Sequence, residues 1–192
     1  CSLAGDPIYR KSLPPDKPKY KDEKAITDKL LSEKYIMQPK VDGAHNLFIF
    51  QPEGRIRAVS YRPRKGIEGV IDHTYKVPFL MGKKVPEELK NTIVRGEIWA
   101  AKPSGKAIPA AALGGLLNSK TLKSREQQDK LSTPLKATLF DVEKFKGEDY
   151  SSKPYEEKLK ALEEIKAKIP EFNIPVSVSS PETKLKLIQK IK

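Results

Sequence analysis

The chain has 192 residues, of which 38% are hydrophobic and 32% charged, a balance that fits one folded domain and excludes a disordered chain. The longest mostly apolar stretch, residues 107–117, contains a proline and two glycines and is too short to cross a bilayer, so no membrane partner is expected. Lys and Arg total 37 against 25 Asp and Glu, and the resulting net charge of +12 favours polyanionic partners over a merely solvated basic surface.

The single cysteine, Cys1, excludes an internal disulfide and suits a reducing compartment. We therefore expect an intracellular protein, in the cytoplasm and nucleoid or in a nucleus, that acts as a monomer. A mitochondrial location and a secreted mature lipoprotein that begins at Cys1 stay open as alternatives.

Residues 1–21 are rich in Pro, Lys and Asp without periodicity, which predicts an extended lead-in before one domain over residues 22–192. Hydrophobic patterning then predicts the elements in chain order. They are a helix at 23–34, a strand at 35–37, a hairpin of strands 46–50 and 55–61 around the turn 51–54, a strand at 93–99, a helix at 107–117 broken near Gly114-Gly115, a strand at 137–142, a helix at 155–168, a strand at 174–178 and a helix at 181–192 capped by Ser180.

The helix at 155–168 has the clearest pattern. Its apolar face carries Leu159, Leu162, Ile165 and Ile169, with Ser152 as the expected N-cap, Pro154 in the first turn and Pro170 ending the helix. Strands dominate the first half of the chain and mix with helices in the second. This order predicts an α+β fold with mostly antiparallel sheets flanked by helices.

Lys40 lies in the string Gln38-Pro39-Lys40-Val41-Asp42-Gly43, directly after an expected apolar strand. A lysine becomes a nucleophile only when its amine is deprotonated, which partial burial and nearby positive charge, including a bound metal, both promote. Gly43 would allow a sharp turn or a close approach of the backbone to a ligand. The alternative is a surface turn, because Lys-x-Asp-Gly is also a good turn sequence.

Two later strings add to Lys40. Gly96-Glu97-Ile98-Trp99 places a carboxylate near the end of a strand, and Leu139-Phe140-Asp141-Val142 places an aromatic ring within one. Taken singly, Glu97 fits a strand-edge charge and Phe140 fits a core residue. In this order and spacing, the three strings resemble the covalent nucleotidyltransferases, the superfamily of ATP-dependent DNA ligases, RNA ligases and mRNA capping enzymes.

The resemblance implies roles for single residues. Lys40 would be the catalytic residue that takes AMP from ATP covalently. Gln38 would read the adenine amino group, Glu97 would contact the ribose and help to place Mg²⁺ or Mn²⁺, and Phe140 would stack on the base. Tyr61-Arg62 resembles the Ser-Arg pair that contacts phosphates. The remaining implied residues are Pro39, Val41 and His45 for the nucleotide, and Arg62, Arg64 and Lys65 for the nucleic-acid backbone.

The stretch 140–149, followed by Pro154 and a charged amphipathic helix, resembles the DNA ligases in particular. The resemblance implies a nucleotidyltransferase (ATP-grasp-like) domain that uses ATP to seal nicked duplex DNA. An RNA ligase, which shares the adenylation step, is an alternative, and so is a nucleic-acid-binding fragment without activity.

Three departures from the family pattern concern completeness. His45 stands where the family motif usually has an arginine, and it lacks the permanent charge and fork of that residue. The string Glu68-Gly69-Val70 precedes Glu97, although the family's Glu-Gly-hydrophobic motif follows the stacking aromatic. The family's Lys-x-Lys motif is not convincingly present, since Lys190-Ile191-Lys192 has the matching residues but ends an expected helix. The family's OB-fold is also missing. We therefore expect a truncated adenylation domain, incomplete at the C-terminus, that does not complete ligation alone.

Two other kinds of site are excluded by the sequence. His45 and His73 are too few and too far apart for a zinc site without cysteine ligands. Gly105, Gly114 and Gly115 do not form the pattern of a phosphate-binding P-loop.

Overall fold

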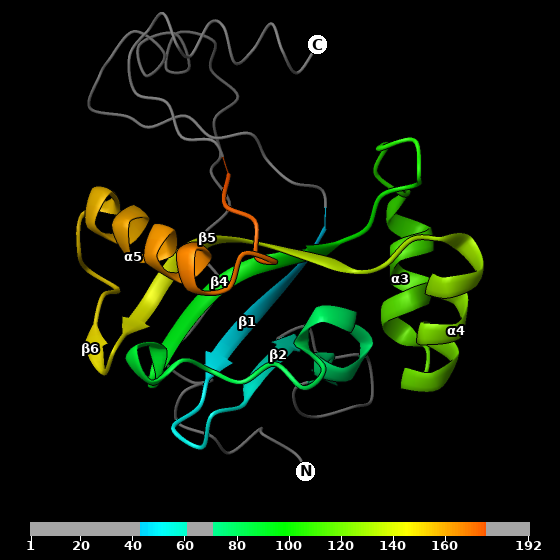
Figure 1. Ribbon diagram of the computed structural model, residues 1–192. Helices are drawn as coiled ribbons and strands as arrows, with labels where there is room; N and C mark the ends of the chain where they lie inside the picture. The colour runs from blue at the N-terminus through cyan, green and yellow to red at the C-terminus, as the bar shows by residue number, and fades with distance from the viewer. Residues whose placement is uncertain (1–42, 61–70, 176–192) are drawn as a thin grey trace, which may run out of the picture. The chain divides into compact units, whose positions relative to one another are not determined.

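A six-stranded sheet forms the centre of the protein, in the order β3-β2-β1-β4-β5-β6 (Figure 1). The structure, a computed structural model, describes residues 43–60 and 71–175, and those up to Ile174 belong to one compact unit. Every pair of neighbouring strands in the sheet is antiparallel. The expected α+β class with an antiparallel sheet is confirmed.

The strands are β1 (Ala44–Phe50), β2 (Ile56–Ser60), β3 (Ile71–Asp72), β4 (Thr92–Trp99), β5 (Lys136–Phe145) and β6 (Glu148–Asp149). The helices are the 3-10 helices η1 (Thr74–Lys76), η2 (Pro78–Leu80) and η3 (Glu87–Leu89), and the α-helices α3 (Ala110–Asn118), α4 (Thr121–Leu131) and α5 (Tyr155–Lys168). Over residues 43–60 and 71–175, no helix is long and apolar enough to cross a membrane.

The expected hairpin is present as β1 and β2. The Gln51 amide donates to the Arg55 carbonyl oxygen at 2.8 Å, and Gly54 takes the φ of +97° that the turn requires. The expected strands at 93–99 and 137–142 appear, slightly longer, as β4 and β5. The two-residue strands β3 and β6 were not predicted, because so short a segment carries no readable alternation.

Helix α5 has the expected bounds, but its predicted cap is wrong. Pro154, not Ser152, is the N-cap residue, and no side chain caps the helix. Glu156 and Glu157 in the first turn instead place negative charge at the positive end of the helix dipole. Leu162 and Ile165 are buried as expected, whereas Leu159 is only half-buried.

The predicted break in the helix near Gly114-Gly115 is also wrong, because α3 continues through both glycines. The leucines at 113, 116 and 117 are buried, and this packing outweighs the roughly 1 kcal/mol that each glycine costs in a helix. Helix α4 was not predicted at all. Its buried residues are polar, Ser124 and Gln128, so hydrophobic periodicity could not indicate it.

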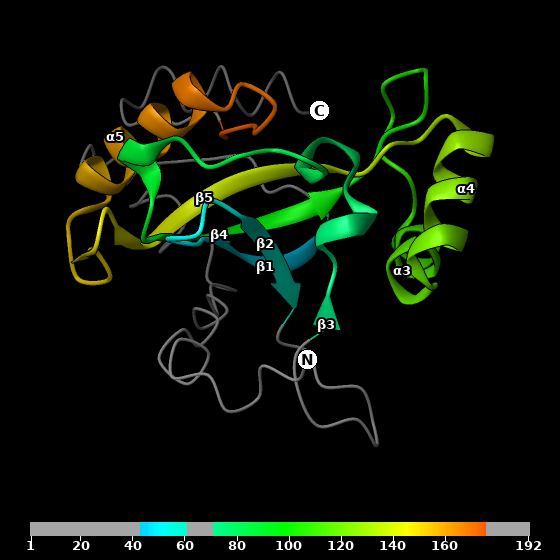
Figure 2. The same cartoon turned by 60° about the horizontal axis from the view of Figure 1, so that its bottom comes forward.

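The hydrophobic core lies between the sheet and the helices. Figures 1 and 2 show α5 across one face of the sheet beside β5, with α3 and α4 together where β4 ends and β5 begins. Phe172, which follows α5, is fully buried, and its ring contacts those of Phe48, Phe50 and Phe79. The core therefore joins β1 to the segment that follows α5.

Several expectations concern parts of the chain outside the described residues. These are the lead-in at 1–21, the helices at 23–34 and 181–192, the strand at 35–37 and most of the strand at 174–178. Of the last, Ile174 and Pro175 are described and lie in no strand. Instead, the preceding residue, Asn173, forms a parallel bridge with Thr138 of β5.

Candidate functional site

Three of the residues implicated by the sequence lie together on adjacent strands, namely His45 on β1, Glu97 on β4 and Phe140 on β5. His45 is the direct antiparallel partner of Glu97, and such pairs have Cβ atoms about 4.5–5.5 Å apart. The ring centroids of His45 and Phe140 are 5.8 Å apart, with the ring planes tilted by 51°. All three residues are half-buried. The arrangement brings an aromatic ring, an imidazole and a carboxylate together on one part of the sheet.

Gly43, the last residue of the Lys-x-Asp-Gly string, packs against the same carboxylate. A Cβ atom at Gly43 would lie 2.6 Å from the Ile98 carbonyl oxygen and 3.2 Å from Glu97 Oε2. Gly43 has no positive φ, so the glycine is not required for a sharp turn. It is required because β4 leaves no room for a side chain where the chain enters β1.

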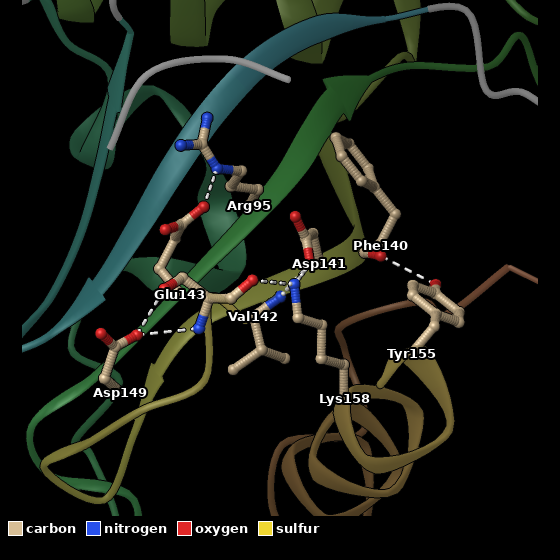
Figure 3. Close-up of polar contacts among 9 residues, drawn as sticks. Arg95, Phe140, Asp141, Val142, Glu143, Asp149, Tyr155 and Lys158 are labelled. Carbon is tan, nitrogen blue, oxygen red and sulfur yellow. Dashed lines mark hydrogen bonds and ion pairs between the residues drawn. The ribbon is translucent and has the colours of Figure 1, made fainter. Parts of the chain in front are cut away.

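Phe140 lies at a β-bulge, which sequence patterning did not reveal. Gly96 pairs with Leu139 and Arg95 with Asp141, so Phe140 is the extra residue between them. Bulges re-aim side chains and increase the local twist of a strand. The Phe140 carbonyl oxygen accepts a hydrogen bond of 2.8 Å from the Tyr155 hydroxyl at the start of α5 (Figure 3). Helix α5 thereby fixes the backbone of the bulge.

A second contact from α5 holds the residue after Phe140. Lys158 Nζ donates to Asp141 Oδ1 at 2.9 Å and to the Ser151 carbonyl oxygen at 3.1 Å. Asp141 Oδ1 also accepts the Val142 amide at 2.8 Å. The side chain of Lys158 is only 11% exposed, so its charge is stabilised by these oxygens rather than by water. The sequence indicated a charged helix here, but nothing in it paired Lys158 with Asp141.

Arg95 and Glu143 form a further ion pair between β4 and β5. Figure 3 shows the two side chains pointing toward each other beside the bulge. The Arg95 side chain is 3% exposed, and a charge so deeply buried requires its partner. This pair braces the two strands that carry Glu97 and Phe140.

The other predicted site residues lie outside the described residues. These are Gln38, Pro39, Lys40 and Val41 around the lysine, and Arg62, Arg64 and Lys65 in the later basic stretch. The roles of all of them, and of His45, Glu97 and Phe140, stay predictions. The described residues that flank the basic stretch, Ser60 and Ile71, are paired between β2 and β3.

Asp72 on β3 anchors the chain just after that stretch. Its Oδ1 accepts the Thr74 amide at 2.9 Å, and its Oδ2 accepts Arg57 at 3.2 Å. Burial raises the pKa of the Asp72 carboxyl, but the hydrogen bonds from Thr74 and the nearby Arg57 outweigh it and hold the pKa below its ordinary value of 3.8. A carboxyl whose pKa falls on folding stabilises the fold at higher pH, and that contribution disappears as the pH falls through the folded-state pKa.

Asp72→Asn is therefore expected to lower the free energy of unfolding at neutral pH and to have less effect at about pH 3. Urea unfolding midpoints of both proteins at the two pH values would measure this. An equal loss at both pH values would contradict the role of the charge.

Metal-binding capacity at the site rests on Glu97. In the part of the chain that the structure describes, no cluster of three or more His, Cys, Asp or Glu residues could hold a metal ion. Magnesium bound with a nucleotide needs only one or two carboxylates, since phosphate oxygens and water supply the other ligands. The half-buried carboxylate of Glu97 fits that requirement.

Two comparisons with known proteins give matches, and the matches are of different kinds. The family described as "ATP dependent DNA ligase domain" matches residues 18–190. Among solved structures, "mycobacterial DNA ligase D complexed with ATP and MES" is similar with 18% identity and a TM-score of 0.49, over 81% of this chain and 44% of that one. The chain thus spans less than half the length of that solved protein. The curated proteins give no match.

Proposed function

Because the chain belongs to the family of ATP-dependent DNA ligase domains, we propose that it takes AMP from ATP onto Lys40 and thereby carries out the adenylation step of an enzyme that seals nicks in duplex DNA. One observation supports this beyond family membership. His45, Glu97 and Phe140 converge on three strands, and Gly43 packs on Glu97. Lys40 precedes Gly43 by three residues, so covalent connectivity limits their Cα atoms to about 11 Å in any conformation.

In the proposed first step, the neutral amine of Lys40 attacks the α-phosphorus of ATP. A P–N bond forms, the bond to the bridging oxygen breaks, and pyrophosphate leaves with the electron pair. An oxygen of the 5′-phosphate at the nick then attacks the same phosphorus and releases Lys40. Finally the 3′-hydroxyl attacks the 5′-phosphate, AMP leaves and the strand is sealed. Positioning and charge stabilisation supply most of the catalysis in such phosphoryl transfers.

The site residues would divide the work of holding the nucleotide. Phe140 would stack on the adenine, Gln38 would read its amino group, and Glu97 would accept a hydrogen bond from the ribose. Glu97 would also hold Mg²⁺ or Mn²⁺, which when bound neutralises phosphate charge. His45 lies beside Glu97 but lacks the fork of an arginine, so its contact with the nucleotide would be weaker than the family's usual one.

The nucleic-acid side of the site would be basic. Arg62, Arg64 and Lys65 would contact phosphates near the nick, which positions the duplex without reading its sequence. We further propose that the protein acts as a monomer inside the cell, where its DNA substrate and ATP occur together. The formal charge of +12 supports the affinity for DNA.

Covalent labelling tests the proposal. Incubation with α-labelled ATP and Mg²⁺, without DNA, should add one AMP per chain, detected by intact mass and by label on a denaturing gel. Lys40→Ala should abolish the label, whereas Lys160→Ala, at an exposed position of α5, should keep it.

Two results would overturn the proposal. Label that survives Lys40→Ala would show that another residue is the nucleophile. Absence of label on the full-length wild-type protein would exclude adenylation and leave a nucleic-acid-binding protein without activity. Sealing of nicks with DNA or RNA at the 3′ side separates a DNA ligase from an RNA ligase, since only the latter requires ribose there.

A further inference from the structure

The face of the sheet that carries Glu97 continues to the end of β4. Alternate residues of a strand lie on one face, so Trp99 follows Glu97 at about 6.7 Å along the strand. Their partners on β5 are Lys136 for Trp99 and Thr138 for Glu97. The Trp99 indole nitrogen donates to Thr138 Oγ1 at 2.8 Å, which fixes the ring. Lys136 Nζ lies 5.4 Å from the centroid of that ring.

The loop after β4 adds two cations to this end of the sheet. Ala101 and Ala107 form an antiparallel bridge, and the Lys102 amide donates to the Lys106 carbonyl oxygen at 2.8 Å. Hydrogen bonds thus order the loop, and the side chains of Lys102 and Lys106 are exposed on it. Figure 1 shows it beyond the end of β4, next to α3.

Negative charge is missing from this region. The chain has no Asp or Glu between Glu97 and Glu126. Within residues 43–60 and 71–175, none of Lys102, Lys106 and Lys136 has an ion-pair partner. Elsewhere in the same residues, lysines at 83, 90, 146, 153 and 158 are all paired with carboxylates. The charges of these three lysines are therefore not offset by an ion pair within the described residues.

We propose that Trp99, Lys102, Lys106 and Lys136, which we term the basic end of the sheet, bind the DNA strand next to the adenylation site. Trp99 presents an aromatic surface to a base or sugar, and the three lysines contact successive phosphates. Cations that contact backbone phosphates hold nucleic acid without reading its sequence, and an aromatic ring beside them can pack on a sugar or on an unpaired base. This inference rests on the proposed function, and it identifies the surface that receives the substrate after AMP transfer to Lys40.

The extent of the surface argues for a strand rather than for ATP alone. Trp99 and Lys136 lie on two strands of the sheet, whereas Lys102 and Lys106 lie on a loop beyond both. A single triphosphate concentrates its charge on three adjacent phosphates. Cations distributed along strand ends and a loop match the phosphates of a polymer better.

The test uses Trp99 itself, because it is the only tryptophan in the chain. The full wild-type protein is titrated with a nicked, 5′-phosphorylated duplex without ATP, and Trp99 emission is followed alongside the anisotropy of labelled DNA. Saturable quenching with the same Kd as the anisotropy change is expected. Lys136→Ala should weaken binding several-fold and reduce the slope of log K against log salt by about 0.9. The matched control, Lys160→Ala on α5, should change neither quantity beyond the small effect of net charge.

The possible outcomes distinguish this inference from its alternatives. DNA binding by anisotropy without any change in Trp99 emission would overturn the inference. So would a Trp99 response to ATP alone with DNA affinity unchanged in Lys136→Ala, which would assign the basic end to the nucleotide. AMP labelling of the same preparation without DNA separates the two proposals. Label without strand contact refutes only the basic end, whereas strand contact without label supports the basic end and refutes adenylation.

Discussion

Replacing Gly43 by alanine is expected to lower the rate of AMP uptake by about 100-fold, because displacing a catalytic group by about 1 Å costs that much. The added Cβ would lie 2.6 Å from the Ile98 carbonyl oxygen and 3.2 Å from both Cβ and Oε2 of Glu97. Carbon atoms do not approach a backbone oxygen this closely, so β1 must move away from β4 or Glu97 must turn aside. Under the proposed function, either movement displaces the carboxylate that would place the nucleotide. The rate of label incorporation at saturating ATP measures the effect.

Gly115→Ala provides the control for Gly43→Ala. Gly115 lies in α3 with nothing within 4 Å of an added Cβ. Alanine there should raise the free energy of unfolding by about 0.5–1 kcal/mol and leave labelling unchanged. For Gly43→Ala, overpacking should cost about 1–3 kcal/mol of stability, so unfolding curves verify that the variant is folded under assay conditions. Labelling at the wild-type rate by folded Gly43→Ala would show that the contact with Glu97 does not control the site.

The elements that sequence patterning predicted are those in which local pattern and burial agree. The strands β1 and β4 carry apolar runs, and a turn ending in glycine separates β1 from β2. In α4, by contrast, Gln128 is buried for its hydrogen bonds, since it donates to the Lys76 carbonyl oxygen at 2.8 Å and accepts the Leu135 amide at 3.0 Å. Hydrophobic periodicity cannot predict a helix whose buried face is polar. The family resemblance, which depends on short strings in order, is confirmed by the match over residues 18–190.

The sequence predicts the candidate site as a set of residues and not as a geometry. The order of the strings implied that His45, Glu97 and Phe140 serve one nucleotide. Two features of the geometry depend on pairing between segments about 40 to 50 residues apart. They are the register that places His45 opposite Glu97 and the bulge that leaves Phe140 without a partner on β4. Gly96 illustrates the same limit, because a Cβ there would lie 2.4 Å from the Thr138 carbonyl oxygen. The sequence shows that a glycine precedes Glu97, but it does not show that β5 packs against that glycine.

Replacing Phe172 by alanine is expected to lower the free energy of unfolding by about 3–5 kcal/mol, the usual cost of emptying a buried aromatic site. Phe172 is fully buried, and its ring centroid lies 5.5 Å from that of Phe48, 5.9 Å from Phe50 and 5.1 Å from Phe79. Two of these rings are fixed on β1 and the third on η2, so they cannot collapse together into the space and a cavity persists. Urea unfolding followed by the emission of Trp99 measures the loss.

The same substitution should reach the site through the backbone. Asn173, the next residue, donates its amide to Ala137 at 2.9 Å and accepts the Leu139 amide at 2.8 Å, so it is bonded to β5 on either side of Thr138. Loosening Phe172 weakens that bridge beside Glu97, and AMP labelling should fall before global unfolding as urea is added. Leu122→Ala, at a side chain that is 79% exposed, should change stability by less than about 0.5 kcal/mol and leave labelling intact. If Phe172→Ala lowered the free energy of unfolding by less than about 1 kcal/mol, the ring cluster would not be the centre of the core. If labelling and the fold were lost at the same urea concentration, Asn173 would have no separate influence on the site.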